Sequence, residues 1–203
     1  MSVPRLVRVT AEVVLFALLL AASPLATAQT TATGYYNAGV QKYKAGDRAG
    51  AIADFSKAIE VDRKHWKAYS SRGVARRDGG DLNGAIADYT RSIELNPDNA
   101  GAYSNRSVAL RDKGDVKGAL ADCSRALQLD PRDSWTYNNR GVLKADLGDL
   151  PGALGDFTEA IRLKPDYAEA YFNRSVVRKR VGDPANAATD RARAVELDPR
   201  FKQ

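Results

Sequence analysis

The amino-acid sequence predicts an all-α solenoid of five stacked units, because three features return every 34 residues along the chain. A Gly-Asp pair recurs at Gly46-Asp47, Gly80-Asp81, Gly114-Asp115, Gly148-Asp149 and Gly182-Asp183. A tyrosine recurs at Tyr35, Tyr69, Tyr103, Tyr137 and Tyr171, and a proline at Pro97, Pro131, Pro165 and Pro199. A fixed period of this size is typical of repeat proteins, in which each unit buries its apolar face against its neighbours.

Residues 1–28 are predicted to be a secretory signal peptide. Arg5 and Arg8 supply the positive start, Val13–Ala22 is an uncharged apolar run, and Ala26-Thr27-Ala28 offers small residues at the two positions that signal peptidase reads. The apolar run is shorter than the ~20 residues that span a bilayer. We therefore expect cleavage after Ala28 and an exported protein, in a bacterial periplasm or secreted, without a membrane span after processing.

The remaining residues, 29–203, form the predicted solenoid domain, with units at 32–65, 66–99, 100–133, 134–167 and 168–201. Each unit is expected to contain two helices joined by a tight turn. In the third unit, Asn99 caps a helix over 100–113, and Gly114 ends it because glycine accepts a left-handed conformation. Asp115 then caps a second helix over 116–129, which stops before Pro131.

Apolar spacing supports the same helices. In the second helix of the second unit, residues at helical intervals form one inward face: Ala85, Ile86, Tyr89, Ser92, Ile93 and Leu95. Helices of about 14 residues are marginal on their own, so packing between units must stabilise them.

Positions within the unit show what kind of repeat this is. Position 4 is always tyrosine and position 20 always alanine, and position 27 is small. Position 8 holds Gly39, Gly73, Ser107, Gly141 and Ser175, and position 24 holds Phe55, Tyr89, Cys123, Phe157 and Arg191. This pattern resembles the tetratricopeptide repeat family, and the resemblance implies a right-handed superhelix. Arg63 departs from it where the first proline is expected, and Arg191 suits a terminal helix that faces water.

Residues that could carry catalysis or hold a metal are sparse. His65 is the only histidine, and Cys123, the only cysteine, lies in another unit at a core-facing position. A catalytic triad needs its members to converge, and a metal site needs several clustered ligands. The glycines lie at helix ends and form no phosphate-binding loop. We therefore predict no enzyme, no cofactor and no metal; a cell-wall hydrolase is the alternative with least support.

Charged residues form a second repeating pattern. Position 7 holds Arg72, Arg106, Arg140 and Arg174, and position 23 holds Asp54, Asp88, Asp122, Asp156 and Asp190. An arginine on the packing side of a helix needs a partner, so we expect each to pair with an aspartate on an adjacent helix. The alternative is an arginine stripe that binds anionic ligands. The formal net charge of +6 is small, and positive and negative residues are mixed along the chain. Together with the expected export, this disfavours nucleic-acid binding.

The family resemblance implies that the first helices line a concave groove through positions 2, 5, 6, 9, 12 and 13. The candidate binding residues there are amides, valines, aromatic residues and cations: Asn37, Asn105, Asn138, Asn139, Asn173, Val74, Val108, Val142, Trp135, Phe172, Arg77, Arg111 and Lys179. Valines could accept apolar side chains of a ligand, and asparagines could hold its extended backbone. Alternatively, the valines and asparagines settle packing between units. A carboxylate clamp is disfavoured, since only the asparagine at position 6 matches it.

The sequence therefore predicts an exported, non-catalytic scaffold that binds a peptide or partner protein in its groove. The expected state is a monomer. The alternative is a structural protein that self-associates through its repeat ends, although the polar last helix counts against end-to-end stacking.

Overall fold

In the computed structural model, residues 31–202 are described, and the predicted signal peptide lies outside them. The described chain folds into α-helices arranged in five consecutive pairs, followed by a short 3-10 helix. The pairs are α3 (Ala32–Lys44) with α4 (Arg48–Val61), α5 (Trp66–Asp78) with α6 (Leu82–Leu95), α7 (Ala100–Asp112) with α8 (Val116–Leu129), α9 (Ser134–Asp146) with α10 (Leu150–Leu163), and α11 (Ala168–Arg180) with α12 (Pro184–Leu197), before η1 (Pro199–Lys202). These helices confirm the predicted all-α fold, and each pair lies within one of the predicted units.

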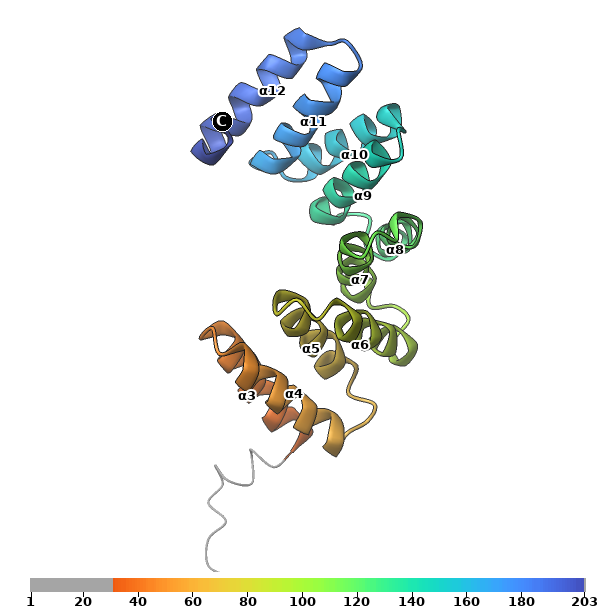
Figure 1. The fold of residues 1–203 in the computed structure, drawn as a ribbon, viewed down its shortest axis with the longest axis vertical. Coiled ribbons are helices and arrows are strands. Elements are labelled where there is room, and N and C mark those ends of the chain that lie inside the picture. Colours follow the sequence, from red (N-terminus) through yellow and green to blue (C-terminus); the bar gives the residue numbers. More distant parts are fainter. Residues whose placement is uncertain (1–30, 203) are drawn as a thin grey trace, which may run out of the picture.

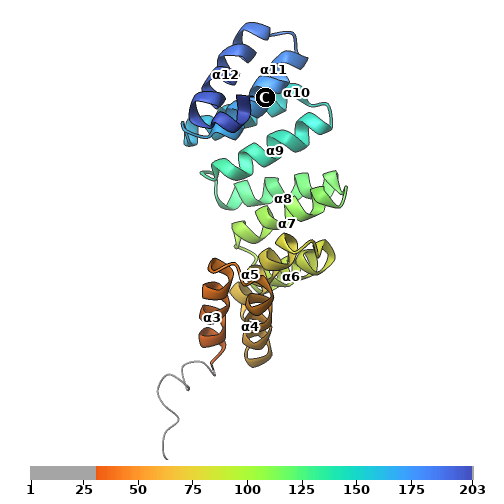
Figure 2. The same cartoon turned by 60° about the vertical axis from the view of Figure 1, so that its left-hand side comes forward.

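The pairs stack in sequence order into an arch, with α3 and α12 at opposite ends (Figures 1 and 2). The second helices α4, α6, α8 and α10 each pack against the first helix before them and the first helix after them, and α12 packs against α11 and η1. Successive first helices also contact one another along the arch. They therefore line its inner, concave side, as the family resemblance implied. No helix among residues 31–202 is both long and apolar enough to cross a bilayer.

The turn inside each unit follows the Gly-Asp pair. Gly114 has a φ of 87°, in the left-handed region that favours glycine, and the other four glycines of these pairs match it. The Asp115 carboxylate then accepts a hydrogen bond of 2.9 Å from the Gly118 N–H at the start of α8. Asn99 caps α7 in the same way, accepting from the Ala102 N–H. The predicted caps of the third unit are confirmed.

The core is a chain of clusters between units. Ala51 and Phe55 of α4 pack with Ala75 of α5, and Ala58 and Ile59 pack with Ala68. The corresponding residues of α6, α8 and α10 pack in the same way against α7, α9 and α11. Each unit therefore buries its apolar face against the next unit.

The predicted arginine–aspartate pairs are present in four units. Arg106 donates from Nε and Nη2 to the two carboxylate oxygens of Asp122, at 2.7 and 2.8 Å. Arg72, Arg140 and Arg174 bind Asp88, Asp156 and Asp190 in the same two-pronged geometry. All four aspartates are buried, so the pairs hold the two helices of a unit together.

Two further features of these pairs were not predicted. In the first unit, position 7 is an alanine, and Lys42 at position 11 binds Asp54 at 2.7 Å. Position 11 also adds a second cation to three other aspartates, through Arg76, Lys144 and Arg178, whereas the third unit has Leu110 there. Asp122 therefore depends on Arg106 more than Asp156 depends on Arg140.

His65 and Cys123 both have structural surroundings. The His65 Nδ1 accepts from the Ala68 N–H at 3.2 Å and caps α5, and its ring lies against Tyr36. Cys123 is fully buried, and its thiol lies 3.2 Å from the Ser107 hydroxyl. The core-facing position predicted for Cys123 is confirmed.

Candidate functional site on the concave face

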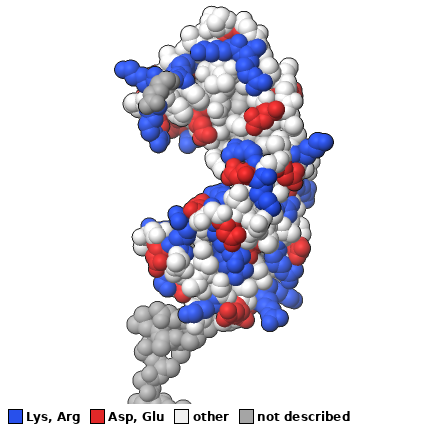
Figure 3. All heavy atoms as spheres, in the orientation of Figure 1, with Lys and Arg blue, Asp and Glu red and all other residues white. Residues whose placement is uncertain are grey.

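Three hollows open on the concave face, which Figure 3 shows as the inner side of the arch. The first has a volume of about 340 Å³ and is lined by Tyr36, Val40, Tyr43, Lys44, Phe55, Ser71 and Val74. The second has a volume of about 320 Å³ and is lined by Tyr36, Trp66, Lys67, Ser70, Ser71, Asn99, Gly101 and Asn105. The third, of about 210 Å³, is lined by Val142, Ala145, Asp146, Phe157, Phe172, Asn173, Val176, Val177 and Arg180.

The first two hollows form one continuous region, because Tyr36 and Ser71 line both. The Tyr36 ring packs at a tilt on Phe55 and His65, with centroids 5.9 and 5.1 Å away, which fixes its orientation. The Tyr43 hydroxyl donates to the Asp78 carboxylate across the α3–α5 step, and this hydrogen bond raises the pKa of the Tyr43 phenol. This end of the groove is therefore aromatic and held in place by its neighbours.

The third hollow lies between α9 and α11 and has an apolar floor. Val142 and Val176 come from position 9 of successive units, and Val176 remains 42 % exposed. Phe172 stacks on Phe201 with ring centroids 4.9 Å apart, so η1 supports this wall. Arg180 lies at the rim and donates to the Ala145 carbonyl at 3.2 Å.

The amide row is divided by burial. Asn105 is half-buried in the second hollow, and Asn173 lines the third. Asn139, between them on α9, is 7 % exposed, and its Nδ2 has no hydrogen-bond partner. Asn37 is exposed at the first unit.

Asn138 requires a correction, because only 1 % of it is exposed. Its Oδ1 accepts from the Asn173 Nδ2 at 3.0 Å, across the step from α9 to α11. Its polar group is therefore used between units, which is the packing alternative, and it does not stand on the groove surface as expected.

The other candidates are spread over the arch. Val74 lines the first hollow and Val142 the third, and Val108 is half-buried on α7, the helix whose Asn105 lines the second hollow. Trp135 is 38 % exposed at the start of α9. Arg77 and Arg111 each bind the aspartate that follows them in sequence, at 3.1 and 3.4 Å. Lys179 lines a hollow at the α12 end. The structure thus brings some of the predicted binding residues together at the hollows and places the others elsewhere on the arch.

Sequence reasoning missed Trp66, Lys67 and Ser70, which line the second hollow. Ser70 occupies position 5, which the family resemblance already directed into the groove, so its position was the available signal. Lys67 occupies position 2, which the family resemblance also directed into the groove, whereas Trp66 occupies position 1, which it did not.

Comparisons with known proteins agree with this architecture. The family model described as tetratricopeptide repeat matches residues 36–93, 72–134 and 138–200. Similar solved structures include the MamA protein (23 % identity, TM-score 0.72, covering 86 % of this chain and 94 % of that chain). They also include YrrB, described as a TPR protein with an unusual peptide-binding site (22 % identity, TM-score 0.71, covering 88 % and 94 %). A third is TTC0263, a thermophilic TPR protein of Thermus thermophilus (23 % identity, TM-score 0.67, covering 84 % and 97 %).

No curated protein matches the sequence. At these identities the solved structures show a shared fold, whereas the family model covers most of residues 36–200 in three matches, of which the first two overlap. The chain belongs to the tetratricopeptide repeat family.

Proposed function

We propose that the protein is an exported, non-catalytic scaffold that binds a peptide, or an extended segment of a partner protein, along its concave face. The observation that carries the proposal is the arrangement of apolar hollows at both ends of one surface, with amide side chains between them. Concave sites with apolar walls and a few placed polar groups are the usual form of binding pockets. The description of YrrB as a peptide-binding TPR protein supports the same mode by analogy of fold.

Each part of the surface has a distinct role in this proposal. The hollow at Tyr36 and Val74 and the hollow at Val142 and Val176 would each take an apolar side chain of the ligand. The Asn139 Nδ2 is a buried donor without a partner, and an unpaired buried donor costs free energy. Asn105 is half-buried and lines the second hollow, so its amide would bind a backbone carbonyl of the ligand, as side chains and main chain do in other modes of peptide recognition.

The test begins with peptides selected from a random display library against residues 29–203. Val176→Asp places a charge in the third hollow, whereas Val61→Asp makes the same change at a 55 % exposed residue at the end of α4. We expect Val176→Asp to weaken binding about tenfold or more, since burying an unpaired carboxylate is costly, and Val61→Asp to leave affinity unchanged. If both variants fold and bind the peptide with equal affinity, the groove is not the binding site.

Export is a separate part of the proposal and rests on the N-terminal sequence. Mass measurement of the protein recovered from an exported fraction should give a chain that begins at Gln29. Ala28→Tyr should block processing, because signal peptidase requires a small residue before the cut, whereas Thr27→Tyr should still be processed. An unprocessed wild-type chain in the cytosolic fraction would contradict export without affecting the groove.

A further inference from the structure

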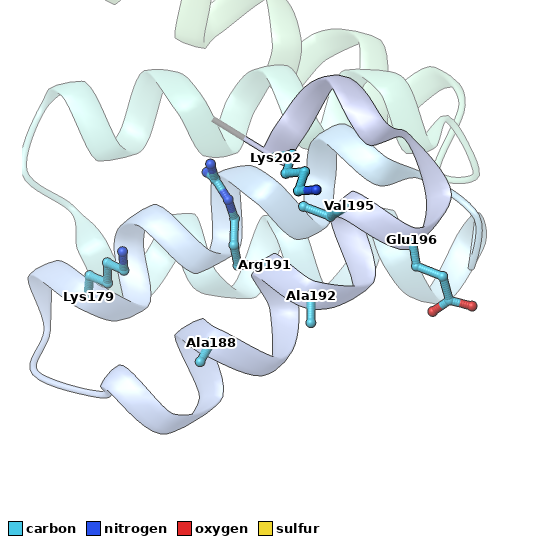
Figure 4. Close-up of a pocket in the computed structure, with 7 residues that line it drawn as sticks. All are labelled: Lys179, Ala188, Arg191, Ala192, Val195, Glu196 and Lys202. Atoms are coloured by element: carbon cyan, nitrogen blue, oxygen red, sulfur yellow. The ribbon is translucent and has the colours of Figure 1, made fainter.

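A fourth hollow lies at the α12 end of the solenoid, on the face of α12 that no further helix pair covers among residues 31–202. It has a volume of about 630 Å³ and is lined by Lys179, Ala188, Arg191, Ala192, Val195, Glu196 and Lys202. Figure 4 shows these side chains along α12, with Lys179 reaching in from α11 and Lys202 from η1. Among its lining residues, only Glu196 is acidic, and in Figure 4 it points away from the three cations.

The four earlier units show what covers this face elsewhere in the molecule. On α4, Phe55 packs on Ala75 and Ile59 packs near Ala68, both from the following helix α5. The covering helix thus presents two buried residues seven apart, which lie on the same face of a helix. The same pairs are Ala102 with Ala109, Thr136 with Leu143, and Ala170 with Val177, all buried. The surface is therefore shaped by its repeat position to receive an α-helix.

The chemistry of the α12 face differs from the internal ones at two adjacent positions. In three internal steps a hydroxyl accepts from the arginine of the covering helix: Ser56 from Arg72 at 3.0 Å, Thr90 from Arg106 at 3.0 Å, and Thr158 from Arg174 at 3.1 Å. Ala192 occupies the hydroxyl position in α12 and has no acceptor.

One residue earlier, Arg191 replaces the aromatic side chain of α4, α6 and α10 and supplies donors instead. Its guanidinium lies 4.6 Å from the centre of the Phe172 ring, which holds it beside the hollow. Lys179 and Lys202 add two more cations around it. The polarity of this face therefore differs from that of the internal interfaces, because α12 lacks the hydroxyl acceptor of α4, α6 and α10 and presents a guanidinium donor at the adjacent position.

We propose that this end binds an acidic amphipathic helix of a partner protein, which covers Ala188, Ala192 and Val195 and places carboxylates on Arg191, Lys179 and Lys202. This site is distinct from the concave groove and does not depend on it. The positive charge of this end disfavours a second copy of the chain that stacks end to end. The first helix among residues 31–202, α3, contains Lys42 and Lys44 and no acidic residue.

The test uses two labelled peptides made from the α7 sequence, Ala100–Asp112, which contains the pair Ala102 and Ala109. Both are side-chain stapled, because an isolated 13-residue helix is marginal. One peptide keeps the sequence and the other carries Arg106→Glu and Arg111→Glu. We expect the full-length protein to bind the acidic peptide at least about tenfold more tightly by fluorescence anisotropy, from charge complementarity.

A matched exchange of residues sharpens the test. The Ser175→Gly/Arg191→Phe/Ala192→Thr variant recreates the residue types of the internal faces, with the glycine at position 8 that the ring requires, so its preference should reverse toward the unaltered peptide. Lys202 lies outside the core, so Lys202→Glu should weaken binding of the acidic peptide and leave binding of the unaltered peptide unchanged. Arg125→Phe, at an exposed arginine of α8, should change neither affinity.

Equal binding of the two peptides would overturn the proposal, as would an unchanged preference in both the exchange variant and Lys202→Glu. A concentration-dependent dimer in light scattering that is lost in Lys202→Glu would also overturn it, because the occupant would then be a second copy.

Discussion

At the scale of single residues, the buried aspartates determine what each arginine contributes. Asp122 is bound by Arg106, with Leu110 at the position where other units place a second cation. Asp156 is bound by Arg140 and also by the Lys144 Nζ at 2.8 Å. Removing one arginine therefore leaves a buried carboxylate unpaired in the third unit and still paired in the fourth.

We expect Arg106→Ala to lower the free energy of unfolding by about 3 kcal/mol, as for other buried charges that lose their partner. Arg140→Ala should cost clearly less, and Leu110→Lys should recover part of the Arg106→Ala loss. Urea unfolding of the four proteins measures this. Equal losses for the two arginines would show that Lys144 does not compensate and that the paired geometry has been misjudged.

Burial also controls the ionisation of Cys123. It raises the pKa of the Cys123 thiol to about 11, although the hydrogen bond with Ser107 acts in the opposite direction and lowers that pKa. The thiol of an unfolded chain ionises near about 8.5. Between these two pH values the Cys123 thiol is ionised in the unfolded state but still protonated in the folded state. The stability that this thiol contributes is therefore complete below a pH of about 8.5 and is lost as the pH rises toward 11.

We therefore expect Cys123 to react with a thiol reagent at pH 8 only as fast as the protein unfolds, and to react at once in denaturant. The stability advantage of wild type over Cys123→Ala should shrink as pH rises above the unfolded thiol pKa. Rapid labelling of the native protein at pH 8 would contradict the buried, protonated thiol.

At the scale of helices, positions 8 and 24 of a unit vary together. Gly39, Gly73 and Gly141 face Phe55, Tyr89 and Phe157, whereas Ser107 faces Cys123. A Cβ atom at Gly141 would lie 2.7 Å from the Phe157 ring. In the first four units, the two helices therefore hold either a large ring with glycine or a small side chain with serine, whereas the fifth unit has Ser175 with Arg191, whose guanidinium lies over the Phe172 ring.

Gly141→Ser should thus destabilise the protein by about 2 kcal/mol through overpacking. The Gly141→Ser/Phe157→Cys variant, which copies the third unit, should lose less than the sum of the two single changes. A double-mutant cycle by urea unfolding measures this coupling. Additive losses would mean that the two positions do not share one packing space.

The helices could be predicted from sequence because their ends depend on local chemistry. Gly114 adopts the positive φ that follows one helix, and Asp115 caps the next helix, so neither feature depends on distant residues. The pairing of Arg106 with Asp122 was also predictable, since the two recur together at fixed positions. By contrast, the pairing of Lys42 with Asp54 was missed, because an alanine replaces the arginine in the first unit.

The candidate site was less predictable, because a hollow forms from what several units leave unfilled. Asn138 and Asn139 are neighbours of the same type, yet one binds Asn173 between units and the other keeps a free donor. That difference arises from the step between α9 and α11, which the period alone does not describe. Likewise, Lys179 fits the groove pattern by position but lies at the α12 end of the solenoid.

At the scale of the whole molecule, the arch carries two separate surfaces, a concave groove along the first helices and the face at the α12 end (Figures 1 and 4). Since each unit contacts mainly its neighbours, neither surface needs the other to be occupied. Peptide binding along the concave groove, as proposed, requires one ligand to lie across both of its apolar ends.

The most direct measurement is photo-cross-linking of a selected peptide to proteins that carry a benzoylphenylalanine at Tyr36, Val176 or Val61. We predict cross-links from Tyr36 and Val176 to opposite ends of the same peptide, because these residues line the first and third hollows. We predict none from Val61, at the end of α4. Cross-links from Val61, with none from Tyr36 and Val176, would contradict binding along the concave face.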